Sequence, residues 1–69
     1  MSPERLVYMA NQIGRFFESQ GESEAVAGTL DHIEKFWDPR MRREIVAYVE
    51  GGGEGLAPNV RAAVLALKG

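Results

Sequence analysis

The chain has 69 residues, which limits it to one small domain with a modest hydrophobic core. It contains no cysteine and a single histidine, His32, so a disulfide framework and a cysteine-rich zinc site are both excluded. Eight basic and ten acidic residues give a formal net charge of −2, which argues against a surface devoted to nucleic-acid phosphates or anionic lipids. We therefore expect partners that are neither nucleic acid nor membrane.

The N-terminal stretch has the pattern of an amphipathic helix over residues 3–19. Ser2 can cap its first turn, and Pro3 suits its first helical position. Apolar residues then recur at spacings of three and four: Leu6, Met9, Ala10, Ile13, Phe16 and Phe17. The stretch lacks the features of a secretory signal, and no run approaches about 18 apolar residues, so we expect a cytoplasmic protein.

A second helix is predicted over residues 23–36, after Gly21 interrupts the first pattern. Its predicted apolar stripe consists of Val26, Leu30, Ile33 and Trp37, with Ala25, Thr29 and Phe36 beside it. Asp38 must leave the helix because a residue before proline disfavours the helical region, yet Asp followed by proline also favours a helix start. Asp38 and Pro39 should therefore end one helix and begin the next, with Trp37 in the core.

The remaining chain predicts two further helices, over residues 39–50 and 58–67. Their inward positions are Met41, Ile45, Tyr48 and Val49 in the first, and Val60, Ala63, Val64 and Leu67 in the second. A glycine-rich linker over residues 51–57 separates them, and no window shows the alternation of a half-buried strand. We expect one all-α domain over residues 1–69, a small bundle of three main helices plus a short C-terminal fourth helix.

No catalytic, metal-binding or cofactor-binding pattern is visible. His32 lacks a second ligand one turn on, where Phe36 stands. Gly55 is followed by Leu56 rather than by the Lys and Ser or Thr of a phosphate-binding loop, so the glycine run predicts a flexible connector. The serines lie at predicted helix ends, where capping explains them. We expect a chain that is not catalytic by itself.

The positive charges of the arginines at the start of the third helix must be compensated by a partner or by solvent. Cations there oppose the helix macrodipole, at a cost of about 0.3 to 1 kcal/mol each. Arg40 can pair with Glu44, whereas Arg42 and Arg43 have no acid at the matching later spacing. These two are either solvated, or they meet acidic groups or a phosphate on another molecule.

The chain has many apolar and aromatic residues for its length, more than a small core can bury. Apolar side chains left on the surface favour a domain that docks onto another protein. The candidate partner-binding residues are Asn11, Gln12, His32, Phe36, Arg40, Arg42 and Arg43, and the structural turn and core residues are Trp37, Asp38, Pro39 and Met41. Gly14 costs about 1 kcal/mol in a helix relative to alanine, so it is either tolerated or allows a close approach by another backbone or a ring.

Three stretches, MANQIGRFFESQG, HIEKFWDPRMRREI and GGGEGLAPNVRAAV, carry a resemblance that covers nearly the whole chain. In this order they resemble the delta subunit of soluble, NAD-dependent, molybdenum-containing formate dehydrogenases, and the segment from Phe36 to Arg42 is the most specific piece. Gly14 departs from the resemblance, which leads us to expect a small residue such as alanine there.

The resemblance implies a non-catalytic subunit that joins the large alpha subunit, where the bis-molybdopterin guanine dinucleotide is held. It implies a role in holoenzyme assembly or in insertion of the molybdenum cofactor, within a complex that also carries iron–sulfur clusters and FMN. A cofactor-sulfuration or insertion chaperone is a second candidate partner.

Two other interpretations stay open at the level of sequence. The chain could be a free-standing helical adaptor for a different large partner. It could also imitate a helix-turn-helix, with the arginine-led helix in the major groove, although the acidic net charge and the short connection disfavour this. Exposed apolar surface also predicts self-association of the isolated chain.

Overall fold

The computed structural model describes residues 2–68, and within that range the chain forms four α-helices and no β-strand. The helices are α1 (Pro3–Glu18), α2 (Glu22–Phe36), α3 (Pro39–Glu50) and α4 (Pro58–Lys68). The prediction of a small all-α bundle is confirmed. Compared with the predicted ranges, α1 ends one residue earlier, α2 begins one residue earlier and α4 ends one residue later.

Local signals explain where α1 and α2 begin. The Ser2 hydroxyl accepts a hydrogen bond from the Arg5 N–H at 3.3 Å, and Pro3 lies in the first turn. Gly21 precedes α2 with a φ of 107°, a backbone conformation that side chains with a Cβ rarely adopt. Glycine therefore allows the chain to reverse between the two helices.

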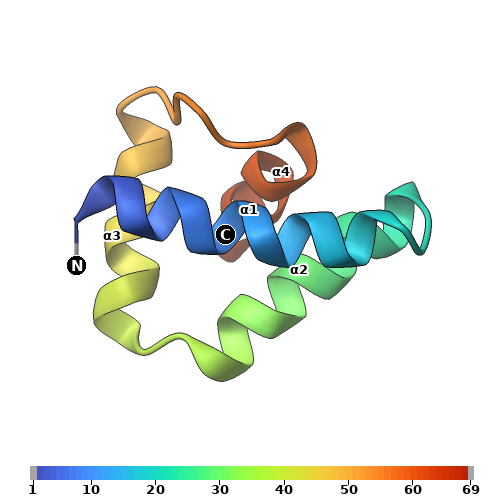
Figure 1. The fold of residues 1–69 in the computed structure, drawn as a ribbon. Helices are drawn as coiled ribbons and strands as arrows, with labels where there is room; N and C mark the ends of the chain where they lie inside the picture. Colours follow the sequence, from blue (N-terminus) through green and yellow to red (C-terminus); the bar gives the residue numbers. More distant parts are fainter. Residues whose placement is uncertain (1, 69) are drawn as a thin grey trace.

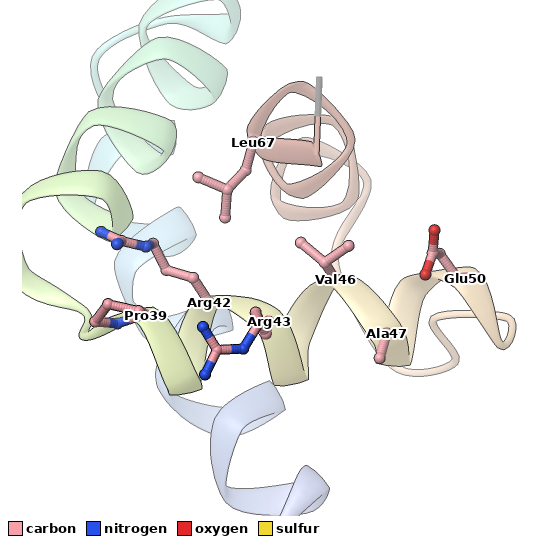
Figure 2. Close-up of a pocket in the computed structure, with 7 residues that line it drawn as sticks. All are labelled: Pro39, Arg42, Arg43, Val46, Ala47, Glu50 and Leu67. Atoms are coloured by element: carbon pink, nitrogen blue, oxygen red, sulfur yellow. The ribbon is translucent and has the colours of Figure 1, made fainter.

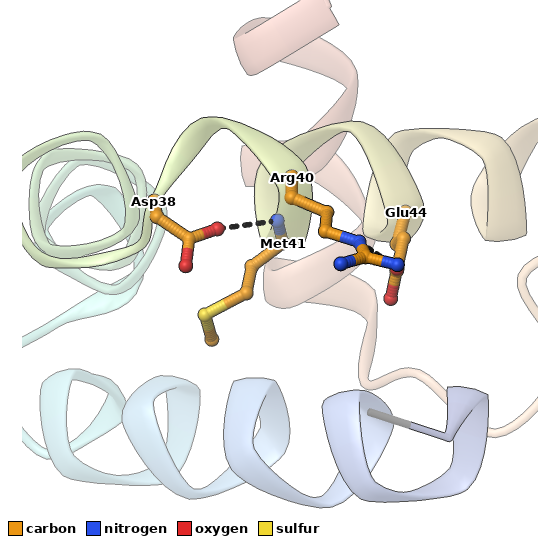
Figure 3. Close-up of polar contacts among 4 residues, drawn as sticks. All are labelled: Asp38, Arg40, Met41 and Glu44. Atoms are coloured by element: carbon orange, nitrogen blue, oxygen red, sulfur yellow. Dashed lines mark hydrogen bonds and ion pairs between the residues drawn. The ribbon is translucent and has the colours of Figure 1, made fainter.

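The turn between α2 and α3 contains only Trp37 and Asp38. The Asp38 Oδ1 accepts a hydrogen bond from the Met41 N–H at 2.9 Å (Figure 3). Pro39 is the first residue of α3. Trp37 is in an extended conformation and buried, with 5% of its surface exposed. One short connection thus caps a helix and anchors itself in the core.

The four helices surround a single core (Figure 1). α1 and α2 lie side by side and run in opposite directions, and α3 crosses the end of this pair where α1 begins (Figure 1). α4 lies behind α1 in this view and packs mainly against α2. The buried cluster comprises Leu6, Ala10, Ile33, Trp37, Ile45, Val49, Leu56, Val60 and Val64. Trp37 is its one aromatic member, so every phenylalanine lies outside this cluster.

The buried face of α2 differs from the predicted stripe. Ala25 and Thr29 are fully buried, whereas Val26 and Leu30 are only partly buried. The Thr29 hydroxyl donates a hydrogen bond to the Ala25 carbonyl oxygen at 2.6 Å, which satisfies its polar atom in the core. A small face on α2 lets α4 pack closely, and this contact outweighs the preference for burying the larger side chains.

Gly14 lies where α1 and α4 meet. A Cβ at this position would overlap Cγ2 of Val60, a fully buried residue at the start of α4. The Asn59 side-chain amide also donates to the Gly14 carbonyl oxygen at 3.2 Å. Of the two interpretations of Gly14, the structure supports close approach, although the approaching groups are the side chains of Val60 and Asn59 and not the backbone or ring that was expected.

The glycine-rich segment over residues 51–57 is fastened to the bundle, which corrects the expectation of a flexible connector. The Asn11 side chain donates to the Gly55 carbonyl at 2.9 Å and accepts from the Ala57 N–H at 3.0 Å. Arg61 donates to the carbonyls of residues 52 and 53 at 2.9 and 3.0 Å, and the Tyr48 hydroxyl donates to that of residue 54. Glycine here supplies positive φ angles in an ordered loop.

Candidate functional site: an aromatic row and a basic groove

Four aromatic rings form a connected row across the outer face of α1 and α2, which we call the aromatic row. Phe16 and Phe17 meet edge to face with ring centroids 5.0 Å apart, and Phe17 lies 6.5 Å from His32. His32 in turn lies 4.7 Å from Phe36. The two end rings are the most open, since Phe16 is 64% exposed and Phe36 is 72% exposed.

The packing between α1 and α2 positions the middle of this row. The Phe17 ring rests on Gly28 of α2, where a Cβ would overlap its ring carbons. Gln12 and Ile13 lie one turn before the phenylalanines and complete a hollow of about 270 Å³ with Phe16, Phe17 and His32. The aromatic row therefore contains both exposed rings and a shallow apolar recess, the features that suit a protein interface.

The three arginines at the start of α3 have three different environments. Arg40 pairs with Glu44 at 3.6 Å, as predicted, and its side chain is 84% exposed (Figure 3). Arg42 donates a hydrogen bond to the Glu34 carbonyl oxygen at 2.9 Å, near the C-terminal end of α2. Arg43 is exposed and makes no hydrogen bond or ion pair with any residue from 2 to 68.

Arg42 thus has a partner that the sequence could not indicate. The last carbonyl groups of a helix carry partial negative charge and lack intrahelical donors. The guanidinium of Arg42 supplies a donor and a positive charge there, which offsets its unfavourable place near the start of α3. It links α2 and α3 across their turn, and of the three arginines it has the clearest structural role.

A groove of about 520 Å³ lies between α3 and the end of α4 (Figure 2). Val46 of α3 and Leu67 of α4 point into it, beside Ala47. Pro39, Arg42 and Arg43 lie at one end of the groove and Glu50 at the other (Figure 2). We call it the basic groove, because an apolar floor here adjoins two arginines.

The predicted partner-binding residues separate into three groups. Gln12, His32 and Phe36 come together at the aromatic row, whereas Arg42 and Arg43 line the basic groove. Arg40 lies outside both, and both polar ends of Asn11 are engaged by the linker. Among residues 2–68, the ring of Phe36 contacts His32, and no cation–π contact joins it to an arginine.

Several surface residues were missed as partner candidates. Phe16 and Phe17 were placed in the predicted core stripe of the first helix, and Val46 and Leu67 were not considered as surface. The adjacent Phe16-Phe17 pair could have indicated that one ring is exposed. Neighbouring residues of a helix point about 100° apart, so one small core cannot bury both.

From residue 2 to residue 68, no group of three His, Cys, Asp or Glu side chains is arranged to hold a metal ion. No helix in the same range is long and apolar enough to cross a membrane.

Comparison with known proteins identifies a family that matches most of the chain. The family model described as NADH-dependant formate dehydrogenase delta subunit FdsD matches residues 5–64. That range includes all of the aromatic row and every residue of the basic groove except Leu67. No curated protein and no solved structure matches the chain.

Proposed function

The chain belongs to the family of NADH-dependent formate dehydrogenase delta subunits, and from this we propose that it is a non-catalytic accessory subunit that binds the large alpha subunit. Its role is to support assembly of the holoenzyme or insertion of the molybdenum cofactor. This function uses a docking surface rather than a reacting group. Family membership favours it over a free-standing adaptor and over a helix-turn-helix-like binder of nucleic acid.

The exposed rings of the aromatic row are the main structural support for this proposal. Phe16 and Phe36 are 64% and 72% exposed, while the buried cluster is completed by other side chains. Large exposed aromatic surfaces are costly in water and are typical of the centres of protein interfaces. A partner that covers both rings removes them from water, and the hollow beside Gln12 and Ile13 can receive one of its side chains.

We assign the redox groups of the complex to the other subunits. Iron–sulfur clusters are held by cysteine thiolates, and this chain has no cysteine. The bis-molybdopterin guanine dinucleotide belongs on the alpha subunit in this proposal, and FMN also lies outside this chain. We place the complex in the cytoplasm.

Co-purification of the alpha subunit with variants of the chain tests the proposal. The double variant Phe16→Ala/Phe36→Ala removes both exposed rings, and alanine favours the helical state at each position. Truncation of an interface anchor commonly costs about 2 kcal/mol, or roughly 30-fold in affinity. Leu65→Ala is the matched control, because Leu65 is a half-exposed apolar residue on α4 and belongs neither to the aromatic row nor to its hollow.

We expect recovery of the alpha subunit to fall sharply with the double variant and to stay normal with the control. Circular dichroism should show the same helix content for all three chains. Full recovery of the complex with a folded double variant would contradict docking through the aromatic row.

A further inference from the structure

We propose that the basic groove binds an amphipathic helical segment of the alpha subunit, with an acidic side chain of that segment against Arg43. This inference rests on the proposed function, and it adds a second contact that the aromatic row does not supply.

The unpaired charge of Arg43 is the first argument. Arg40 forms an ion pair with Glu44, and Arg42 donates a hydrogen bond to the Glu34 carbonyl oxygen. Arg43 has no such partner within residues 2–68. A guanidinium presents several fixed donors that match a carboxylate in a two-point contact. An acidic side chain is therefore the group that this end of the groove fits best.

The floor of the groove gives the second argument. Val46 and Leu67 offer apolar surface from two different helices, and Ala47, on the Glu50 side of Val46, adds a small side chain to the lining (Figure 2). A groove between two helices is suited to an amphipathic helix that inserts its apolar face. The described residues contain no strand whose edge could pair with an extended segment, so an added helix is the geometry that this surface accommodates.

The fixed position of Arg42 gives the third argument. Its bond to the Glu34 carbonyl holds its side chain across the α2–α3 turn, so the wall of the groove beside Arg43 is already ordered. A surface that is ordered before binding loses less conformational entropy when the partner arrives. Arg42 thus shapes the site, and Arg43 is left to make the charged contact.

The aromatic row and the basic groove differ in how strictly they select a partner surface. Apolar rings accept many partner surfaces of suitable shape, whereas an arginine at the end of an apolar groove requires an acid at a defined place. We infer that the groove sets the orientation of the chain on the alpha subunit. A partner segment without an acid would leave Arg43 partly covered and unpaired.

The test measures affinity of the purified chain for the enzyme complex that lacks it. Arg43→Glu and Arg43→Ala are compared with Arg40→Glu, which changes a charge in the same helix turn but outside the groove. Loss of a cation near a helix start favours the helix, so all three variants should fold. We expect Arg43→Ala to weaken binding about 30-fold, Arg43→Glu to weaken it further, and Arg40→Glu to change it less than about threefold.

Salt provides a second measurement. The affinity of the wild-type chain should fall as ionic strength rises, and Arg43→Ala should show a flatter dependence. Equal losses for the Arg40 and Arg43 variants would indicate general charge attraction and would overturn the proposal. Unchanged binding by Arg43→Glu would overturn it as well.

The outcomes also separate this inference from the proposed function. If Phe16→Ala/Phe36→Ala weakens the complex and Arg43→Glu does not, the docking function stands and the groove assignment is wrong. If the wild-type chain does not bind the complex, both are wrong. If Arg43→Glu instead abolishes a dimer of the isolated chain, seen by sedimentation, the occupant of the groove is a second copy and not the alpha subunit.

Discussion

Replacing Gly14 with alanine should destabilise the bundle, although alanine is the better helix former. The new Cβ would overlap Cγ2 of Val60, a fully buried residue. Valine is β-branched and its χ1 rotamer is stiff, so its methyl group cannot turn away easily. The start of α4 must move instead, and the hydrogen bond from the Asn59 amide to the Gly14 carbonyl moves with it.

Two opposing terms set the size of the effect. The gain in helix propensity is about 1 kcal/mol, and inserting a methyl group into a packed contact costs about 1 to 3 kcal/mol. Because Val60 is completely enclosed, we place the cost near the upper end and expect a net loss of about 1 to 2 kcal/mol. For a domain of this size, that loss lowers Tm by roughly 5 to 15 °C.

Thermal and urea unfolding followed by circular dichroism measures this change, with Gly51→Ala as the control. Gly51 has a φ of −85°, and a Cβ there would meet nothing nearer than the Ala47 carbonyl oxygen at 3.6 Å. The control should be unchanged or more stable by up to about 1 kcal/mol. A Gly14→Ala chain as stable as the wild type would refute the argument that α1 and α4 are in tight contact at this point.

Three further predictions concern contacts of single residues, and a fourth concerns the chain as a whole. Trp37→Ala should unfold the chain or nearly so, because truncating a buried tryptophan costs about 3 to 5 kcal/mol against a total of similar size; a near-normal melting curve would contradict this. Arg42→Ala should lower the unfolding free energy by about 1 kcal/mol in urea titrations, through loss of its partly exposed bond to Glu34, and an unchanged midpoint would argue against that bond in solution. Asn11→Ala should increase amide hydrogen exchange at Ala57, because the N–H of Ala57 loses its acceptor, and unaltered protection there would show that another group holds the linker. The purified chain alone should give no formate-dependent reduction of NAD, and turnover by a preparation free of other subunits would disprove its accessory role.

The features that were predictable from sequence are local ones. Ser2 and Asp38 each cap a helix whose first turn contains a proline, and both signals lie within four residues of the backbone they bind. Apolar spacing, together with the cap, proline and glycine signals, identified all four helices. These interactions depend on neighbours in the chain, so a sequence contains all the information they need.

The features that were missed depend on distant neighbours. Thr29 is buried and Leu30 is not, because α4 packs closely against the small side chains of α2. Asn11 finds its partners 44 and 46 positions away, and Arg42 finds its partner on the preceding helix. Hydrophobicity alone favours burial of Leu30 and of Phe16, and only the three-dimensional arrangement shows that the core is complete without them.

Asn11 is synthesised well before the linker that it binds. Asn11 emerges from the ribosome before the backbone groups at residues 55 and 57 that it binds. At about 5 to 20 residues per second, α1 waits roughly 2 to 9 s for these partners. During that interval the inner face of α1, which includes Leu6 and Ala10, lacks the cover of α4. A chain that ends before Gly55 would therefore lack both the groups that Asn11 binds and α4, and it could not close its core.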